Sequence, residues 1–281
     1  MSLLARGGLL PVLTPTLMGI GFITVGSLVD PLGGIAPGLG ILMLLIAVFF
    51  ANFWRDPDRP IPRDEGVIVS PADGHVMFAR RERATGRRPS KAEMAEAEED
   101  EFTGTWHPEA CKEILSFETE QRFEAVPEGE ESEDDVWRIA VFMSPLDVHV
   151  NRSPIAGEII RMEHRTGKGR RRGPFLAAYR KESEFNERVR SLFKRADGLI
   201  VEVMQISGAL ARTIIPWVSE GASMRRGERF GMIRLGSRVD VRVPAAQFEV
   251  CVTSAEDGNS DYPKGEFVKA GSTILYREVK E

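Results

Sequence analysis

Side chains able to do chemistry are few and scattered along this chain. The 281 residues include four histidines and two cysteines, which are His75, His107, His149, His164, Cys111 and Cys251. No H-x-H or H-E-x-x-H pattern occurs, which argues against a zinc peptidase. Two cysteines are also too few for a disulfide scaffold or a cysteine-only zinc site.

A Gly-Ser pair, Gly236-Ser237, lies where the strand-like runs Arg229–Leu235 and Arg238–Val243 meet. Glycine adopts positive φ at little cost, so this pair fits a hairpin bend. Another such pair, Gly271-Ser272, precedes a short run near the C-terminus. Local pattern alone therefore assigns no chemistry to either serine.

Short strand-like runs separated by turn signals dominate residues 55–281. Besides the two runs around Gly236-Ser237, they are Val67–Ser70, His75–Arg80, Trp137–Met143, Glu158–His164, Leu199–Ile206, Thr213–Val218, Phe248–Thr253 and Thr273–Val279. One run, Ser183–Phe193, has apolar residues at helical spacing and predicts a helix. We therefore predict a β-dominated α+β domain.

Two internal echoes refine this prediction. Ser70–Gly74 (SPADG) recurs as Ser153–Gly157 (SPIAG), and the G-x5-G turn Gly221–Gly227 recurs at Gly265–Gly271. Such turns, with an apolar and then a basic residue inside, resemble those of barrel-sandwich hybrid folds. The alternative is that glycine-rich hairpins simply look alike.

The N-terminal end is built for a membrane. Residues 1–54 contain only two charges, Arg6 and Asp30, and the uncharged stretches 7–29 and 31–54 are each long enough to cross a bilayer. Arg6 and Arg55 at the outer ends favour cytoplasmic termini. We predict a transmembrane or re-entrant helical hairpin over residues 1–54, with a domain of residues 55–281 on the cytoplasmic face of the cell membrane. A cleaved signal peptide plus one anchor is the alternative, but no small-residue cleavage site is evident.

Charge divides the rest of the chain unevenly. The net charge of −5, from 37 basic and 42 acidic residues, excludes a strongly basic nucleic-acid binder. Residues 80–135 look like an acidic insertion, a solvated loop with a helix near residues 91–101, or else an acidic partner site. Residues 161–195 hold 12 basic and four acidic side chains and predict a loop that meets anionic lipid headgroups. Nucleic acid, or a merely solvated basic face, is the alternative there.

Five ordered stretches carry the most specific signal. They are Phe53–Pro57 (FWRDP), Ile68–Gly74 (IVSPADG), Phe142–Pro154 (FMSPLDVHVNRSP), Gln205–Arg212 (QISGALAR) and Arg226–Val241 (RGERFGMIRLGSRVDV). In this order they resemble the phosphatidylserine decarboxylase family in its short bacterial form. The resemblance omits the first 52 residues, the 80–135 segment and the last 40.

The resemblance implies a proenzyme that processes itself. The Ser237 hydroxyl would attack the carbonyl of Gly236, and cleavage would give chains 1–236 and 237–281 that stay associated. Ser237 would become a pyruvoyl group, which forms a Schiff base with the amine of phosphatidylserine before CO₂ is lost. The product would be phosphatidylethanolamine, made at an anionic membrane surface.

The resemblance also suggests which side chains assist. His149 is the candidate base and proton donor, with Asp73 as the residue that orients it and His75 as a weaker candidate for assistance. Longer family members carry a second histidine where this chain has Arg152, and a threonine where it has Arg238, so the division of duties between two histidines does not transfer. The flanking residues favour cleavage before Ser237 over cleavage before Ser272.

Two other functions fit parts of the sequence. A non-catalytic, membrane-anchored carrier or adaptor of hybrid-barrel type explains the repeats and the hairpin and predicts no cleavage. The same chemistry on another seryl phospholipid, such as an archaeal-type lipid, is the other. Neither a metal ion nor nucleic acid is expected, and association into a homo-oligomer stays open.

Overall fold

The computed structural model describes residues 4–29, 34–84, 123–165, 186–208, 213–234, 236–254 and 265–279. The chain divides into two compact units. One contains residues 1–58 together with 146–149, and the other contains residues 59–145 and 150–281.

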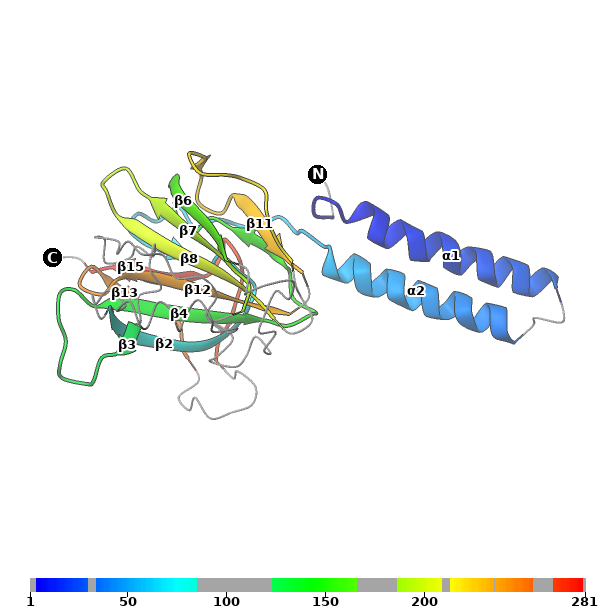
Figure 1. Cartoon of the computed structure of the whole chain (residues 1–281), viewed down its shortest axis with the longest axis horizontal. Helices are drawn as coiled ribbons and strands as arrows, with labels where there is room; N and C mark the ends of the chain where they lie inside the picture. Colours follow the sequence, from blue (N-terminus) through cyan, green and yellow to red (C-terminus); the bar gives the residue numbers. More distant parts are fainter. Residues whose placement is uncertain are drawn as a thin grey trace, which may run out of the picture. The chain divides into compact units, whose positions relative to one another are not determined.

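The first unit is a pair of helices, α1 (Leu9–Leu28) and α2 (Ile35–Phe53), which lie side by side (Figure 1). They approach closely through glycines: a Cβ on Gly19 would lie 2.9 Å from the carbonyl oxygen of Gly40, and one on Gly40 would lie 2.7 Å from that of Gly19. Small residues at such contacts are typical of helices packed in a membrane. Both helices are long and apolar enough to cross a bilayer, which confirms the predicted hairpin, although Asp30 falls outside the described residues.

The second unit is built from strands. These are β1 (Val67–Val69), β2 (Gly74–Ala84), β3 (Phe123–Ala125), β4 (Val136–Met143), β5 (Val150–Arg152), β6 (Gly157–Arg165), β7 (Arg188–Lys194), β8 (Ile200–Ser207), β9 (Ile214–Pro216), β10 (Ser223–Met224), β11 (Arg229–Ile233), β12 (Ser237–Pro244), β13 (Phe248–Val250), β14 (Phe267–Val268) and β15 (Ile274–Glu278).

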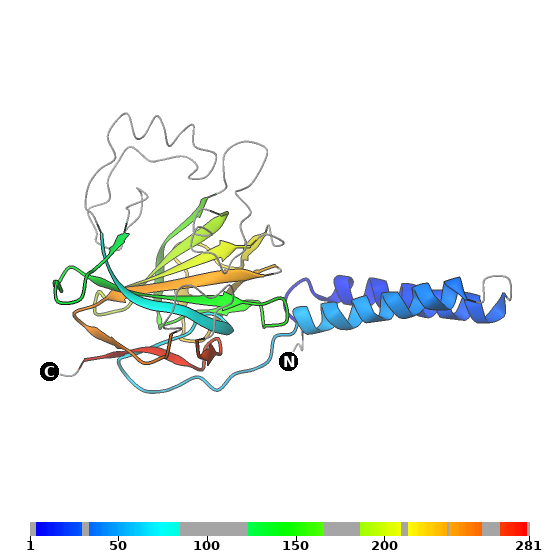
Figure 2. The same ribbon diagram turned by 90° about the horizontal axis from the view of Figure 1, so that it is seen from below.

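Among the described residues, these strands form one large sheet and two small ones. The large sheet has the order β10-β6-β7-β8-β12-β4-β2-β14, with β3 beside β2, and the small sheets are β1-β15-β13 and β5-β11-β9. Figure 2 shows the large sheet as a twisted layer, with β15 in red outside it. The strand-rich domain is confirmed, and the sheets do not close into a barrel.

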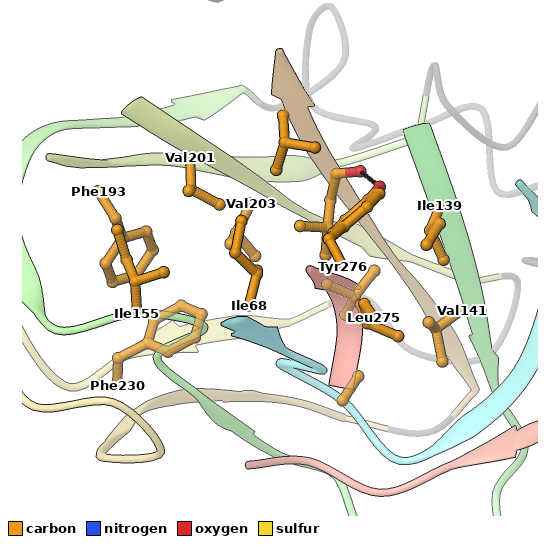
Figure 3. Close-up of a cluster of buried hydrophobic side chains, with 14 of the residues drawn as sticks. Ile68, Ile139, Val141, Ile155, Phe193, Val201, Val203, Phe230, Leu275 and Tyr276 are labelled. Carbon is orange, nitrogen blue, oxygen red and sulfur yellow. Dashed lines mark hydrogen bonds between the residues drawn. The ribbon is translucent and has the colours of Figure 1, made fainter. Parts of the chain in front are cut away.

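The core lies on one face of the large sheet. Alternation along β12 places Val239, Val241 and Val243 on this face and Arg238, Asp240 and Arg242 on the other. The core side chains in Figure 3 include Tyr276 of β15, whose hydroxyl donates to the carbonyl of Val241 at 2.8 Å. Packing of the small sheets on this face therefore fixes where β12 lies.

The two pairs of repeated sequence motifs also have matching local structures. The Ser70 hydroxyl donates to the carbonyl of Ala72 at 2.7 Å, and the Ser153 hydroxyl donates to that of Ile155 at 2.6 Å. The strand after each motif pairs with a two-residue strand inside a G-x5-G turn, β2 with β14 and β6 with β10. The similarity is thus a repeat of backbone structure rather than a chance likeness of glycine-rich hairpins.

The two turns also meet each other. The amide of Gly271 donates to the carbonyl of Ser70, and the amide of Gly227 donates to that of Ser153. Both glycines have φ of 76°, and a Cβ on Gly271 would lie 3.4 Å from the Cα of Gly227. Asp73, in the first motif, therefore belongs to a firmly held junction between the two halves of the repeat.

One predicted element is wrong. The run Ser183–Phe193, predicted as a helix, contains strand β7, whereas residues 183–185 lie outside the described residues. Its apolar residues match helical spacing, but between β6 and β8 the strand buries both faces, with Val189 and Phe193 in the core and Arg188 and Arg190 opposite. Pairing on both sides overrides the local pattern.

The charged segments also differ from expectation at their ends. Residues 80–84 continue β2 and residues 123–125 form β3, and Glu82 and Asp135 are buried against arginines rather than solvated. The described ends of the 161–195 segment lie in β6 and β7 rather than in a basic loop. Residues 85–122, with the helix predicted near 91–101, and residues 166–185 fall outside the described residues. The charge composition suggested solvated loops, because it does not show that these charged side chains form ion pairs across the sheet.

Candidate functional site

Gly236 and Ser237 connect two different sheets. Strand β11 pairs with β5 and β9, whereas β12, which begins at Ser237, pairs with β4 and β8, so the pair is not a hairpin bend. Gly236 has φ of 69°, and the nearest atom to a Cβ placed there would be 4.0 Å away. Conformation rather than space therefore favours glycine before Ser237.

Ser237 is fully buried at the first position of β12. Its strand partners are Met143 of β4 and Ser207 of β8. The Ser237 hydroxyl donates to the Met143 thioether at 3.3 Å. A thioether is a weak acceptor, so the hydroxyl proton is loosely held.

A pair of buried amides extends this contact. Gln205 Nε2 donates to Asn151 Oδ1 at 2.8 Å, and Asn151 Nδ2 lies 3.9 Å from the Met143 sulfur. The Ser207 hydroxyl and Gln205 Oε1 are buried and have no hydrogen-bond partner among the described residues. The sequence prediction missed these residues, although their signal is visible: Gln205 and Ser207 are polar at core-facing positions of a strand whose other core-facing residues, Val201 and Val203, are apolar.

Asp73 is buried at the end of the SPADG motif. Its carboxylate accepts a hydrogen bond from Arg59 Nη2 at 2.6 Å and another from the amide of Ala270 at 2.7 Å. A Cβ on Gly74 would lie 2.0 Å from the carbonyl oxygen of Phe142, so glycine allows β2 to approach β4 directly after Asp73. Asp73 is thus anchored between the linker and the C-terminal turn.

His149 is buried in the first unit. Its ring packs on Phe53 with centroids 4.3 Å apart, and its Nδ1 lies 2.8 Å from the carbonyl oxygen of Asp147. Burial lowers the pKa of His149 to about 4, against the opposing effect of the Asp147 carbonyl, and Arg55 lowers it further. An Nδ1–H that donates to this carbonyl leaves Nε2 as a proton acceptor at neutral pH.

The three residues of the predicted triad therefore belong to two different units of the structure. Ser237 and Asp73 lie in the second unit and His149 in the first. The group at His149 Nδ1 is the Asp147 carbonyl, and the Asp73 carboxylate is held by Arg59 and Ala270. The pairing of Asp73 with His149 stays a prediction.

The remaining histidines have structural contacts. His75 Nδ1 lies 2.9 Å from the carbonyl oxygen of Gly265, and its ring meets the ring of Phe267, which ties β14 to β2. His164 Nε2 lies 2.8 Å from the Glu187 carboxylate, and the side chain is 42% exposed. His107 lies outside the described residues. No cluster of three or more potential metal ligands occurs among the described residues.

Ser272, the alternative cleavage position, lies in a different environment. Its hydroxyl donates to the carbonyl of Pro60 at 2.9 Å, and its amide donates to that of Lys269. It is only partly buried, within the turn that precedes β15. Gly271 also has positive φ, so backbone conformation alone does not distinguish Gly271-Ser272 from Gly236-Ser237.

The face of β12 opposite the core carries a buried ion network. Arg138 of β4 donates to Asp240 at 2.8 Å, and Arg238 donates to the same carboxylate at 2.6 Å. Burial alone would raise the pKa of Asp240, but Arg138 and Arg238 hold it well below its ordinary value. The network joins residues on both sides of the Gly236-Ser237 bond.

Comparisons with known proteins identify the class as a decarboxylase. The protein-family model for phosphatidylserine decarboxylase matches residues 46–276. A phosphatidylserine decarboxylase proenzyme from Erythrobacter litoralis is 36% identical over 84% of this chain and 75% of its own length. One from Symbiobacterium thermophilum is 35% identical over 85% and 83%, and one from Nitratidesulfovibrio vulgaris is 33% identical over 94% of both.

The chain belongs to the phosphatidylserine decarboxylase family, as its motifs predicted. A relative from Methanopyrus kandleri, 34% identical over 85% of this chain and 86% of its own length, has a name that refers to archaetidylserine decarboxylation instead. No solved structure was found to match the chain.

Proposed function

We propose that this chain is a self-processing decarboxylase that converts phosphatidylserine to phosphatidylethanolamine with a pyruvoyl group made from Ser237. One observation carries the proposal. In a member of this family, a buried serine follows a positive-φ glycine at the start of a central strand, with its hydroxyl on a weak acceptor. These features support Ser237 as the nucleophile and the adjoining Gly236 carbonyl as its target.

Processing needs no outside reagent except water. The Ser237 oxygen attacks the Gly236 carbonyl carbon, the amide C–N bond breaks, and the nitrogen of residue 237 takes up a proton. Loss of the Cα proton of residue 237 then expels the Gly236 carboxylate and leaves a carbon–carbon double bond. After this enamine becomes an imine, water replaces its nitrogen, ammonia leaves, and a ketone remains at the new N-terminus.

His149 is the base in this proposal. Its lowered pKa keeps the imidazole neutral at physiological pH, so its proton-accepting form is always available. Asp73 supports the site through charge, because its buried carboxylate is kept in place by Arg59 and the Ala270 amide. Proton return to the decarboxylated substrate is assigned to His149 as well.

The residues around position 237 fit a small polar group there. The Ser207 hydroxyl and Gln205 Oε1, which have no hydrogen-bond partner in the described part of the chain, lie on β8 beside the start of β12 and would offer polar contacts to such a group. A pyruvoyl carbonyl at this position would supply the electron sink that α-decarboxylation of an amino acid headgroup requires. The surrounding strands would hold the group and exclude water.

The two cleavage products would remain together. The small chain, 237–281, begins with β12, which pairs along its length with β4 and β8 of the large chain. The bonds between Arg138 and Asp240 add a buried ionic link between the two products. Dissociation would require breaking the middle of the large sheet.

The substrate explains the membrane segment. Phosphatidylserine stays in the bilayer, and two apolar helices would keep the enzyme at its surface. Arg6 and Arg55 flank the hairpin, which favours the cytoplasmic face by the positive-inside rule. In right-side-out membrane vesicles, protease added outside should leave residues 55–281 intact, and digestion of this domain would contradict the orientation.

Mass spectrometry tests the proposed chemistry. The purified chain should contain a 45-residue fragment, 237–281, of about 5 kDa. Borohydride added with phosphatidylserine should fix a lipid amine on this fragment and on no other. An intact chain, or an adduct elsewhere, would reject the proposal and favour a carrier or adaptor without chemistry.

A related seryl lipid is the second candidate substrate, because the Methanopyrus kandleri relative has a name that refers to archaetidylserine. Vesicles that contain phosphatidylserine or its ether-linked archaeal counterpart separate the two. Turnover on phosphatidylserine at least equal to that on the ether lipid supports the first assignment, and the reverse preference supports the second.

A further inference from the structure

The core-facing side of the large sheet becomes polar at one end. Ser237 of β12 lies opposite Ser207 of β8, and the next core-facing pair is Val239 and Gln205. All four side chains are completely buried. Buried polar groups destabilise a fold unless they are hydrogen-bonded, so this group of polar residues calls for a role beyond packing.

The polar contacts form a chain that ends at Ser237. Because Gln205 Nε2 donates to Asn151 Oδ1, the other side of the Asn151 amide, Nδ2, faces the carbonyl of Pro71 at 3.3 Å and the Met143 sulfur at 3.9 Å. Met143 then accepts from the Ser237 hydroxyl at 3.3 Å. Every member of this chain lies in the second unit.

The backbone leaves room for this arrangement. A Cβ on Gly231 of β11 would lie 3.4 Å from Gln205 Nε2 and 2.9 Å from the carbonyl oxygen of Ile215. A side chain at position 231 would therefore push β11 away from β9 and crowd the amide of Gln205. The glycine lets Gln205 reach Asn151.

The acceptor suits a nucleophile. A carbonyl or carboxylate would bind the proton of a buried hydroxyl more strongly than a thioether does. The Met143 sulfur fixes the direction of the hydroxyl and still lets a base remove the proton. Ser272 shows the contrast, since its hydroxyl donates to a backbone carbonyl.

We propose that Met143, Asn151 and Gln205 are positioning residues that hold the Ser237 hydroxyl for self-processing, each acting through the next. The inference rests on the proposed function. Processing transfers the Ser237 oxygen to the Gly236 carboxylate, so the chain of contacts loses its last member once cleavage is complete. We therefore expect substitutions of these three residues to slow cleavage more than decarboxylation.

The first test is the Met143→Leu variant, which keeps the volume of the side chain but removes the acceptor. The full-length chain is made by cell-free synthesis with lipid vesicles, and the 45-residue fragment is timed by intact mass. Cleavage should slow about tenfold, the effect expected for the loss of one hydrogen bond. Turnover per pyruvoyl group in the chains that do cleave should fall less than twofold.

The matched control is Met204→Leu. Met204 is a buried methionine of β8 that packs on the opposite face of the sheet, against Leu192 and Ile206. It should cleave at the wild-type rate. Thermal unfolding of the two uncleaved variants, each combined with Ser237→Ala, should show the same midpoint, which separates positioning from a general loss of packing.

The second test is Gln205→Glu, which replaces the amide donor by an acceptor. Asn151 must then turn its Nδ2 toward position 205, so the Met143 sulfur loses that neighbour and cleavage slows. Because Gln205 acts through Met143, the double variant with Met143→Leu should cleave no more slowly than the slower single variant.

Each alternative result has a clear meaning. Cleavage of Met143→Leu at the wild-type rate, an equal loss of cleavage and turnover, or multiplied effects in the double variant would overturn the inference. A wild-type chain that never cleaves would instead reject the proposed function itself. The two failures are therefore distinguishable in one time course.

Discussion

Two of the chain's three Gly-Ser pairs, Gly236-Ser237 and Gly271-Ser272, have a glycine with positive φ, and they differ in what surrounds the serine. Gly236 and Gly271 both have positive φ, yet Ser237 is buried on a thioether and Ser272 lies in a turn with its hydroxyl on the Pro60 carbonyl. Ser237 opens a central strand, whereas Ser272 precedes β15 of a small sheet. The comparison teaches that the dipeptide alone does not select the proposed processing site, whereas its surroundings do.

The largest effect should come from exchanging each serine for alanine. Ser237→Ala should abolish cleavage, because it removes the proposed nucleophile, while Ser272→Ala should cleave normally. Intact mass distinguishes a chain of 281 residues from fragments of 236 and 45. Persistent cleavage of Ser237→Ala, or release of a ten-residue piece from the wild type, would reverse the assignment.

The next largest effect should come from His149, the proposed base for cleavage before Ser237. His149→Gln should slow cleavage about 100-fold or more, the usual contribution of a general base. The wild-type rate should stay nearly constant from pH 8 to about pH 5 and then fall as His149 is protonated, because burial lowers its pKa to about 4. A rate that instead falls with a midpoint near 6.5 would show that a solvent-exposed group is the base.

The same histidine should make stability depend on pH. Between its folded pKa of about 4 and its unfolded value of about 6.5, the unfolded chain binds more protons, so stability is full above pH 6.5 and is lost as pH falls. From pH 7 to pH 5 this loss is about 2 kcal/mol. Urea unfolding in detergent should show it for uncleaved Ser237→Ala, and adding His149→Gln should remove that part of the slope.

The sequence predicted the parts of this fold whose signals are local. Strand-like runs bounded by turn signals indicated β4 and β12, and uncharged length indicated α1 and α2, because each of these signals lies within the element itself. Strand β7 was missed because its apolar residues also match a helix, and only pairing with β6 and β8 decides between the two. The two-residue strands β10 and β14 are too short for any periodicity.

The candidate site residues also divide into those that the sequence indicates and those that only the structure reveals. Ser237, His149 and Asp73 stand in long motifs, so a resemblance could indicate them. Met143, Asn151 and Gln205 lie in those motifs too, but their importance depends on contacts between β4, β5 and β8, and Gln205 lies 54 residues after Asn151 in the sequence. A polar residue such as Gln205 stands out in a strand-like run, but the sequence does not show which side chain it contacts on another strand.

The two pairs also differ in what cleavage would release. Cleavage before Ser237 leaves β12 between β4 and β8, whereas cleavage before Ser272 would free only β15 and the C-terminal residues. Asp240→Asn should therefore weaken the hold on the 45-residue chain by about 3 kcal/mol, because Arg138 and Arg238 lose their shared buried carboxylate. Urea should release the small chain from the cleaved variant at lower concentration, and an unchanged midpoint would show that backbone pairing alone holds it.

The smallest effect should distinguish the two glycines themselves. Gly236→Ala and Gly271→Ala both place a Cβ on a left-handed residue, which costs about 1 kcal/mol. Only at Gly271 would that Cβ also press on neighbours, since Ile61 and Arg152 lie 3.0 Å away, so Gly271→Ala should lower stability more. Gly236→Ala should lower stability less but slow cleavage more, because the distorted residue carries the carbonyl under attack. Urea unfolding and the cleavage time course, measured on both variants, should therefore rank them in opposite order, and the same order in both would show that the backbone turn before Ser237 has no part in processing.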